Sequence, residues 1–218
     1  MSRVSRFEAV DGASLDLGDL VRSRTLSQEG MDSALRAGVR VEAIQLTRGA
    51  IGCALSHVRL WQQIAADHGR GATLVLEDDV YFASEFEARL RDAVAHLPAN
   101  FSMVYLNLPD YASRSDISAS GGTTVRAVLG DNYGTSAYIV SPAGARALLR
   151  GVMPLTQQID SHIIAVTERS VRRESGGAAA AAAAAEEPEE APFDVYTVDP
   201  PLVYELKTLH KSDVQVGL

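Results

Sequence analysis

The feature that most constrains the fold is an apolar run that ends in three consecutive acids, ATLVLEDDVYF at residues 72–82. A strand that is apolar on both faces is typical of one buried inside a parallel sheet, and such sheets bind ligands beyond the carboxyl ends of their strands. Three carboxylates at that edge repel one another and lose hydration unless a cation neutralises them. The run therefore predicts a buried strand that leads into a cation site.

The three acids are Glu77, Asp78 and Asp79. A hard divalent ion such as Mg²⁺ or Mn²⁺ would neutralise them, because these ions prefer oxygen ligands. Alternate residues of an extended backbone share a face, so Glu77 and Asp79 would hold one ion while Asp78 points elsewhere. The alternative is a strand that simply ends in solvated acids, and this run alone does not decide between the two.

Composition places the chain among ordinary globular proteins, with 218 residues, 46% hydrophobic and 22% charged, which is the size of one domain. The net charge of −8 argues against a nucleic-acid-binding surface. Cys53 is the single cysteine, so we expect a small core residue, no intrachain disulfide and no cysteine-based zinc site. We find neither a signal peptide nor a run near the ~18 apolar residues that span a bilayer, and expect a soluble, cytoplasmic chain.

Strand patterns alternate with helix patterns, which predicts an α/β fold. We expect strands at residues 6–10, 72–82, 101–108, 133–140 and 193–198, and a shorter one near 125–129 within a long loop at 111–130. We expect helices at residues 33–37, 52–68, 84–97 and 141–151, and within 155–172. An Ala- and Glu-rich stretch at about 174–192 is interpreted as a surface insertion in a single domain spanning 1–218.

Further segments accompany the acidic run: IGCALSHVRLW at residues 51–61, GTSAYIVSPAGA at 134–145, RFEAVDG at 6–12 and Ser-Asp at 212–213. In their order and spacing they resemble glycosyltransferase family 25, the group that contains lipooligosaccharide sugar transferases and collagen galactosyltransferases. The resemblance implies a GT-A-like fold with a mostly parallel central sheet. It also implies inverting transfer of a hexose, galactose or glucose, from a UDP-sugar to a hydroxyl of a glycan or protein.

The resemblance assigns Glu77 and Asp79 as ligands of Mn²⁺ or Mg²⁺ against the donor diphosphate, and Asp78 to a ribose or sugar hydroxyl. A dication there would stabilise the charge that develops on the leaving nucleoside diphosphate. His210, close to the Ser-Asp pair near the end of the sequence, is the expected third protein ligand. Its alternative is a solvated surface histidine.

Gly52, Ser56 and His57 are expected to bind the donor, because a helix that starts near Gly52 presents free N–H groups and positive potential to an anion. Packing or capping roles are the alternatives for Ser56 and His57. Gly134 and Thr135 would line the acceptor side of the substrate cleft, unless Gly134 is only a bend in a strand.

Inverting transfer requires a general base near the acceptor hydroxyl. Asp160, within QIDSH at residues 158–162, is the first candidate, and Asp110 is the second. A helix cap is the alternative role for Asp160.

The chain departs from the family at its start, because only five residues precede the RFEAVDG segment and the usual buried first strand has no counterpart. Omitting an internal strand leaves ladder hydrogen bonds and apolar surface unpaired, unless residues 13–48 or a partner chain, a homo-oligomer among them, fill the gap. This departure favours a second hypothesis, a catalytically inactive relative that binds nucleotide, glycan or protein. A phosphate-ester hydrolase using the same acids lacks a recognisable nucleophile or second metal cluster.

Overall fold

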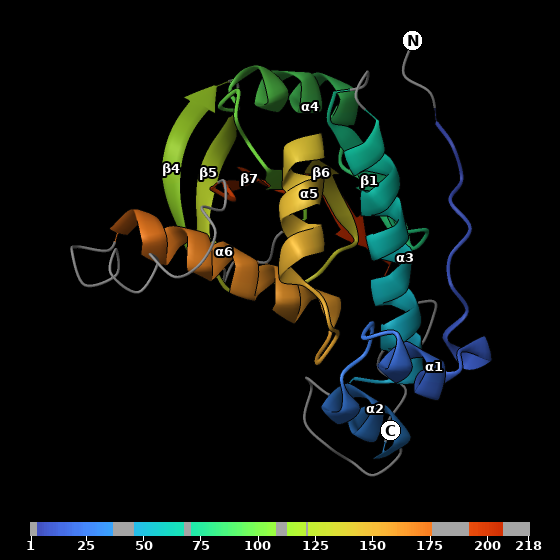
Figure 1. Ribbon diagram of the computed structural model, residues 1–218. Coiled ribbons are helices and arrows are strands. Elements are labelled where there is room, and N and C mark those ends of the chain that lie inside the picture. The colour runs from blue at the N-terminus through green and yellow to red at the C-terminus, as the bar shows by residue number, and fades with distance from the viewer. Residues whose placement is uncertain are drawn as a thin grey trace.

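A six-stranded sheet forms the centre of the molecule, with helices α3, α5 and α6 in front of it in Figure 1. The structure is a computed structural model, and it describes residues 4–36, 46–67, 71–107, 113–120, 122–175 and 192–206. The strands are β1 (Thr73–Leu76), β2 (Val80–Phe82), β3 (Met103–Tyr105), β4 (Ser113–Ser120), β5 (Thr123–Gly130), β6 (Ala137–Val140), β7 (Val195–Asp199) and β8 (Val203–Glu205). The helices are η1 (Gly12–Ser14), α1 (Leu17–Arg22), α2 (Gln28–Arg36), α3 (Arg48–Ala66), α4 (Phe86–Ala95), α5 (Pro142–Gly151) and α6 (Ile159–Ser175).

The direction of the strands differs from the expected mostly parallel sheet. The strand order is β1-β6-β3-β7-β5-β4, and only the β3–β7 pair is parallel. The pairs β1–β6, β3–β6, β5–β7 and β4–β5 are antiparallel. The expectation was wrong because helices cover both faces of this sheet, so its central strands are as continuously apolar as those of a parallel sheet. The α/β class itself is confirmed.

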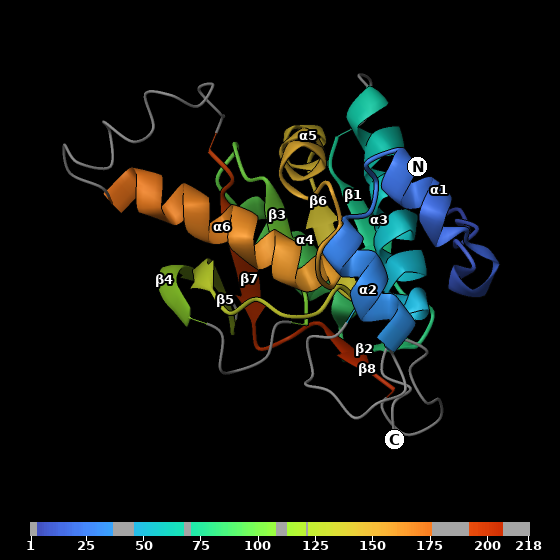
Figure 2. The same ribbon diagram turned by 60° about the horizontal axis from the view of Figure 1, so that its bottom comes forward.

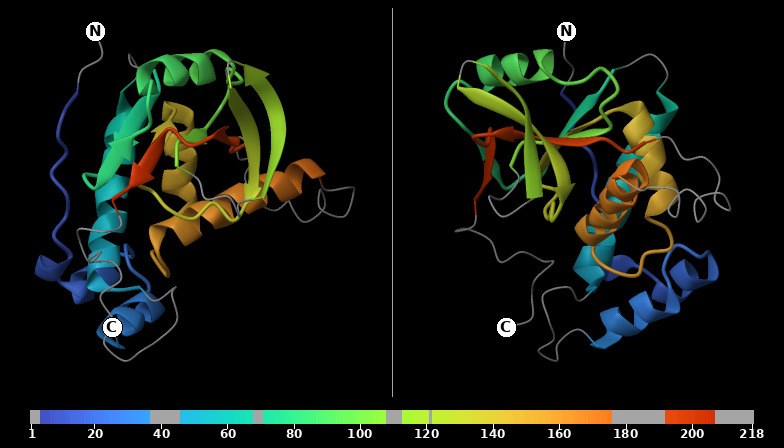
Figure 3. Two further views of the ribbon diagram at one scale, coloured as in Figure 1. Left: turned by 180° about the vertical axis from the view of Figure 1, so that it is seen from behind. Right: turned by 90° about the vertical axis from the view of Figure 1, so that its left-hand side faces the viewer.

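Each face of the sheet has its own hydrophobic cluster. On β3, Met103 and Tyr105 belong to the cluster under α3, α5 and α6, whereas Val104 belongs to the cluster under α4. This alternation follows from the two-residue period of a strand. Figure 3 shows the β4–β5 hairpin on the side of the molecule away from α3.

The expected single strand at residues 72–82 is two strands separated by a turn. β1 ends at Leu76, the residues Asp78 and Asp79 form the turn, and β2 begins at Val80. β2 leaves the large sheet and pairs antiparallel with β8, and Figure 2 shows this pair at the bottom of the molecule. The chain turns here because three adjacent carboxylates favour a solvated corner over a continuous buried ladder.

β1 is an edge strand, not the internal strand that its sequence predicted. It pairs with β6 on one side, and no other strand of the described residues lies on its second edge. Leu74 and Leu76 are 37% and 38% exposed. The described part of residues 13–48 forms helices, and residues 6–10 form no strand, so within the described residues neither segment pairs with the free edge of β1.

Local sequence signals gave mixed results for the other elements. The helix expected at 141–151 is α5, and Ser141 caps it by accepting a hydrogen bond from the Gly144 N–H, with Pro142 at the first position. The helix expected at 84–97 is α4, which starts without a side-chain cap because Glu85 at its N-cap adopts a left-handed conformation. The loop expected at 111–130 is instead the β4–β5 hairpin in its described part.

Candidate functional site

The acidic turn is held on two sides by backbone hydrogen bonds. The Glu77 N–H donates to the Ser136 carbonyl at 2.9 Å, which extends the β1–β6 ladder by one residue. The Leu206 N–H donates to the Asp79 carbonyl at 2.7 Å, next to the β2–β8 pair. The turn therefore lies where the large sheet and the small sheet meet.

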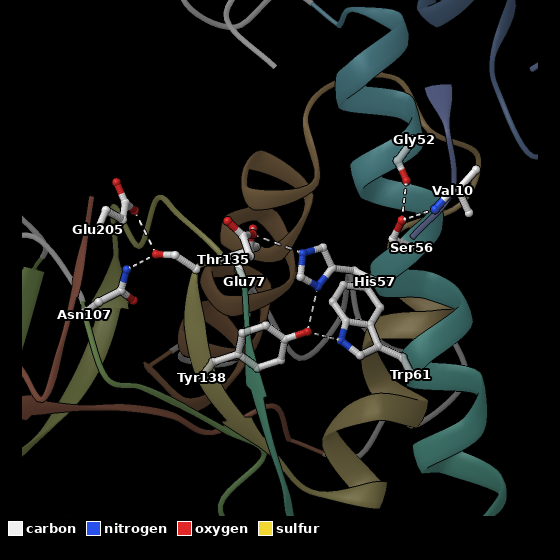
Figure 4. Close-up of polar contacts among 11 residues, drawn as sticks. Val10, Gly52, Ser56, His57, Trp61, Glu77, Asn107, Thr135, Tyr138 and Glu205 are labelled. Atoms are coloured by element: carbon white, nitrogen blue, oxygen red, sulfur yellow. Dashed lines mark hydrogen bonds and ion pairs between the residues drawn. The ribbon is translucent and has the colours of Figure 1, made fainter. Parts of the chain in front are cut away.

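Glu77 receives two contacts on the same carboxylate oxygen. The Thr135 hydroxyl donates to Glu77 Oε1 at 2.8 Å, and His57 Nε2 lies 3.4 Å from that oxygen (Figure 4). Burial alone would raise the pKa of Glu77, but the contacts with His57 and Thr135 outweigh burial and hold the pKa below its usual value. The side chain remains 35% exposed, so an ionised carboxylate is accessible from solvent.

Asp79 has the opposite electrostatic character. Partial burial raises its pKa, and the negative charges of Glu77, Glu205 and Asp78 raise it further, against a backbone hydrogen bond that lowers it. Its Oδ1 atom is buried and has no hydrogen-bond partner in the described part of the chain. A buried acceptor without a partner is costly, and a cation would satisfy it. Asp78 is exposed on the same turn.

Glu205 is a fourth acid at this turn, and sequence reasoning missed it. It lies opposite Val80 in the β2–β8 register, and its Oε1 accepts a hydrogen bond from the buried Ser136 hydroxyl at 2.8 Å. Ser136 Oγ also accepts a short hydrogen bond from the Asn107 side-chain amide. The only sequence signal was an acid at the end of a short strand pattern, which is too common to indicate a site.

A buried group of side chains stands behind Glu77. His57 and Trp61 project from one face of α3 because they are four residues apart, and Tyr138 meets them from β6. His57 Nδ1 lies 2.8 Å from the Tyr138 hydroxyl, and Trp61 Nε1 donates to that hydroxyl at 2.9 Å (Figure 4). Trp61 and Tyr138 are both 0% exposed, which makes Trp61 a core residue.

Cys53 also lies beside this group, although we expected it only as a core residue. Cys53, His57 and Glu77 have ligand atoms within 4.8 Å of one another, the one such group of three that the described residues form. Burial, followed by the charges of Glu77 and Asp160, raises the pKa of the Cys53 thiol to about 12, against a hydrogen bond with Thr135. The raised pKa favours the protonated thiol at neutral pH, so a metal ion bound by Cys53 would have to displace that proton. The Cys-x₃-His spacing was the available signal.

Gly52 and Ser56 contact the N-terminal segment in this structure. A Cβ on Gly52 would lie 2.6 Å from the Val10 carbonyl oxygen, and Ser56 Oγ accepts a hydrogen bond from the Val10 N–H at 2.8 Å. The expected helix start near Gly52 was wrong, because Thr47 caps α3 through the Ala50 N–H. Ser56 and His57 are therefore in the third turn of the helix, where no free N–H groups remain.

The remaining predicted residues divide into two groups. Gly134 has φ of +100°, a conformation that favours glycine, and it places Thr135 against Glu77. Asp160 is in the first turn of α6, where its carboxylate accepts a hydrogen bond from the Ser161 N–H at 2.7 Å, and its charge raises the pKa values of Cys53 and Tyr105. Asp110 and His210 lie outside the described residues, as does most of the Ala- and Glu-rich stretch.

No helix within the described ranges combines the length and apolar character that crossing a bilayer requires.

The sequence matches the family profile described as glycosyltransferase family 25 (LPS biosynthesis protein) over residues 2–163. This match covers well over half of the chain, and the chain belongs to glycosyltransferase family 25.

Individual relatives differ in the activity that their names state. A rat protein named probable inactive glycosyltransferase 25 family member 3 is 32% identical over 145 residues, which are 65% of this chain and 24% of that protein. Human procollagen galactosyltransferase 2 is 28% identical over 147 residues, 65% of this chain and 22% of its own length. Human inactive glycosyltransferase 25 family member 3 is 36% identical over 107 residues, which are 48% of this chain and 18% of that protein. The chain thus matches about a quarter or less of each relative.

Proposed function

We propose that this chain forms the donor-binding part of a metal-dependent glycosyltransferase. It would transfer a hexose, galactose or glucose, from a UDP-sugar to a hydroxyl of a glycan or protein, with inversion. The acidic turn carries this proposal, because a family 25 chain here presents an accessible ionised Glu77 beside an Asp79 oxygen that has no described partner.

The residues at the turn suit a hard dication. Glu77 and Asp79 supply carboxylate oxygens, which Mn²⁺ and Mg²⁺ prefer, and Glu205 adds a third negative charge nearby. When bound, the dication would neutralise the charge that the departing UDP gains. The exposed Asp78 would accept a hydrogen bond from a ribose or sugar hydroxyl.

Asp160 is the proposed general base for the acceptor hydroxyl. It is half-buried at the start of α6, which packs in the same hydrophobic cluster as α3, the helix that carries His57. A carboxylate beside the acceptor hydroxyl can accept its proton as the general base.

A thermal-shift series with UDP-galactose and UDP-glucose, each with and without Mn²⁺, tests the proposal. Binding to the folded state stabilises it by about 2.7 kcal/mol when the ligand is at 100 times its Kd. We expect a Mn²⁺-dependent rise in Tm with one donor, and we expect Asp79→Asn to abolish it. A folded Asp79→Asn variant that responds to Mn²⁺ and donor as the wild type does would overturn the assignment of the site.

A second candidate function is binding without transfer. Two observations favour it: several similar proteins are named inactive, and β1 lies at the edge of the described sheet, where its apolar sequence predicted a buried strand. Release of UDP from the selected donor in the presence of Mn²⁺ separates the two functions. An enzyme releases UDP slowly even without acceptor, whereas a binding module shows saturable donor binding and no release.

A further inference from the structure

A line of polar side-chain contacts runs from the core of the molecule to Glu77. It begins at the Trp61 indole, continues through the Tyr138 hydroxyl and the His57 ring, and ends at Glu77 Oε1, with separations of 2.9, 2.8 and 3.4 Å (Figure 4). The first two members are completely buried and His57 is 6% exposed, so bulk water does not compete for these groups.

The chemistry of Trp61 fixes which groups donate and which accept along this line. An indole N–H can only donate, so the Tyr138 oxygen accepts from it. His57 Nδ1 is the one other described partner of the Tyr138 hydroxyl, so the Tyr138 O–H donates to Nδ1. A neutral imidazole that accepts at Nδ1 carries its proton on Nε2, and Nε2 is the atom that faces Glu77.

Two donors therefore converge on one oxygen of Glu77. His57 Nε2 lies 3.4 Å from Oε1, the Thr135 hydroxyl donates to the same oxygen, and no described residue makes a hydrogen bond to Oε2. These contacts hold the carboxylate with Oε1 toward the protein, and within the described residues Oε2 stays available to a ligand.

We propose that Trp61, Tyr138 and His57 are positioning residues that fix the Nε2–H tautomer of His57 and so present Glu77 Oε2 to a divalent cation. The role of Glu77 in binding a cation rests on the proposed function, whereas the tautomer of His57 does not depend on it. The Nε2–H tautomer also disfavours a metal ion held by Cys53, His57 and Glu77, because such an ion would have to replace the proton on Nε2.

The tautomer is measured directly by long-range ¹H–¹⁵N NMR of the full chain, and comparison with His57→Gln identifies the His57 signals among the five histidines. We expect the Nε2–H tautomer in the wild type. In Tyr138→Phe, which removes only the hydroxyl, we expect the Nδ1–H tautomer to become populated. A wild-type ring with its proton on Nδ1, or a tautomer that Tyr138→Phe leaves unchanged, would overturn the proposal.

The effect on Glu77 is measured by Mn²⁺ titration followed by electron paramagnetic resonance. His57→Leu removes the donor, whereas His57→Gln keeps an amide that can accept from Tyr138 and donate to Glu77. We expect His57→Leu to weaken Mn²⁺ binding by roughly 10-fold or more, and His57→Gln to restore most of the affinity. Tyr138→Phe, with its smaller disturbance, serves if His57→Leu does not fold, and the same direction is expected.

The outcomes separate the two proposals. If the wild type does not bind Mn²⁺, the proposed metal dependence and the cation part of this inference fail together, while the NMR result still decides the tautomer. If Mn²⁺ binds the wild type and a folded His57→Leu or Tyr138→Phe variant equally well, the positioning role fails and the metal site stands. Two results together would overturn the inference in favour of a metal ion at Cys53 and His57. They are a shift of the His57 signals when Zn²⁺ is added, and Mn²⁺ binding that Glu77→Gln leaves unchanged.

Discussion

Glu77 and Asp79 are two residues apart, and their surroundings move their pKa values in opposite directions. Glu77 has neutral or positive partners in Thr135 and His57, which favour its charged form. Asp79 has partial burial and negative neighbours, which favour its neutral form. The turn thus combines Glu77, whose charged form its neighbours favour, with Asp79, whose charged form a cation would stabilise.

This difference predicts opposite effects on stability. A raised folded-state pKa means that Asp79 contributes stability while protonated and loses it as the pH rises through that value, so its charge is unfavourable at pH 7. Asp79→Asn should therefore stabilise the metal-free protein, by up to about 1 kcal/mol or roughly 2–4 °C in Tm. Urea unfolding at pH 7 in EDTA measures it. The gain should vanish as the pH falls below the Asp79 pKa, and a less stable variant at pH 7 would contradict this account.

Glu77→Gln provides the matched comparison. The lowered pKa of Glu77 in the wild type means that its charged form contributes stability above the unfolded-state pKa. That stability is lost as the pH falls through the folded-state pKa. We expect the variant to be less stable at pH 7 by about 1 kcal/mol, after allowing for the exposure of this side chain. An equal or higher stability of Glu77→Gln would show that the contacts of Glu77 with His57 and Thr135 do not favour its charge.

At the scale of elements, α3 carries two different functions on two faces. One face presents Cys53, His57 and Trp61 to β6 and the acidic turn. Another accepts the N-terminal segment through Gly52 and Ser56, where the backbones approach too closely for a side chain. The sequence marked this helix as part of a site, but only packing shows which of its residues face the acids.

The close approach at Gly52 predicts a packing defect on substitution. A Cβ there would lie 2.6 Å from the Val10 carbonyl oxygen and 2.8 Å from the Gly12 nitrogen, so one backbone must move. We expect Gly52→Ala to cost about 1–3 kcal/mol in denaturant unfolding and to expose the N-terminal segment to protease. Gly71→Ala is the control, because a Cβ there meets nothing within 4 Å. Equal stability of the two variants would disprove the packing role of Gly52.

At the scale of the whole molecule, helices α3, α5 and α6 lie together over one face of the sheet. The start of α6 is fixed by His162, whose Nε2 lies 3.1 Å from the Thr156 nitrogen and 3.4 Å from the Gln157 nitrogen. Both backbone groups are N–H donors, so this contact requires an unprotonated Nε2.

This contact predicts acid sensitivity of global unfolding. Burial and then the charge of Arg169 lower the pKa of His162, against an opposing effect of Asp160. A depressed folded-state pKa gives stability above the unfolded-state value of about 6.5, and that stability is lost as the pH falls through the folded-state value. We expect His162→Gln, which can still accept both N–H groups, to lose less Tm between pH 7 and pH 5 than the wild type. Parallel Tm curves for the two proteins would rule out this role.

The sequence by itself determined the features that depend on neighbouring residues. The helical spacing of apolar residues located α3 and α4, and Ser141 with Pro142 set the start of α5. The three adjacent acids marked the turn that this structure places at the junction of its two sheets. Caps and residue periods act over a few residues, so they can be recognised without a fold.

Only the tertiary structure decided strand direction and the partners of the acids. A buried strand has the same apolar sequence whichever way its neighbour runs, so the antiparallel sheet and the edge position of β1 were not encoded locally. Likewise, Glu77 meets His57 and Thr135, and Glu205 reaches the turn, only because β1 pairs with β6 and β2 pairs with β8. Contacts between distant segments depend on pairing and packing across the whole chain, and residue spacing along the sequence carries no record of them.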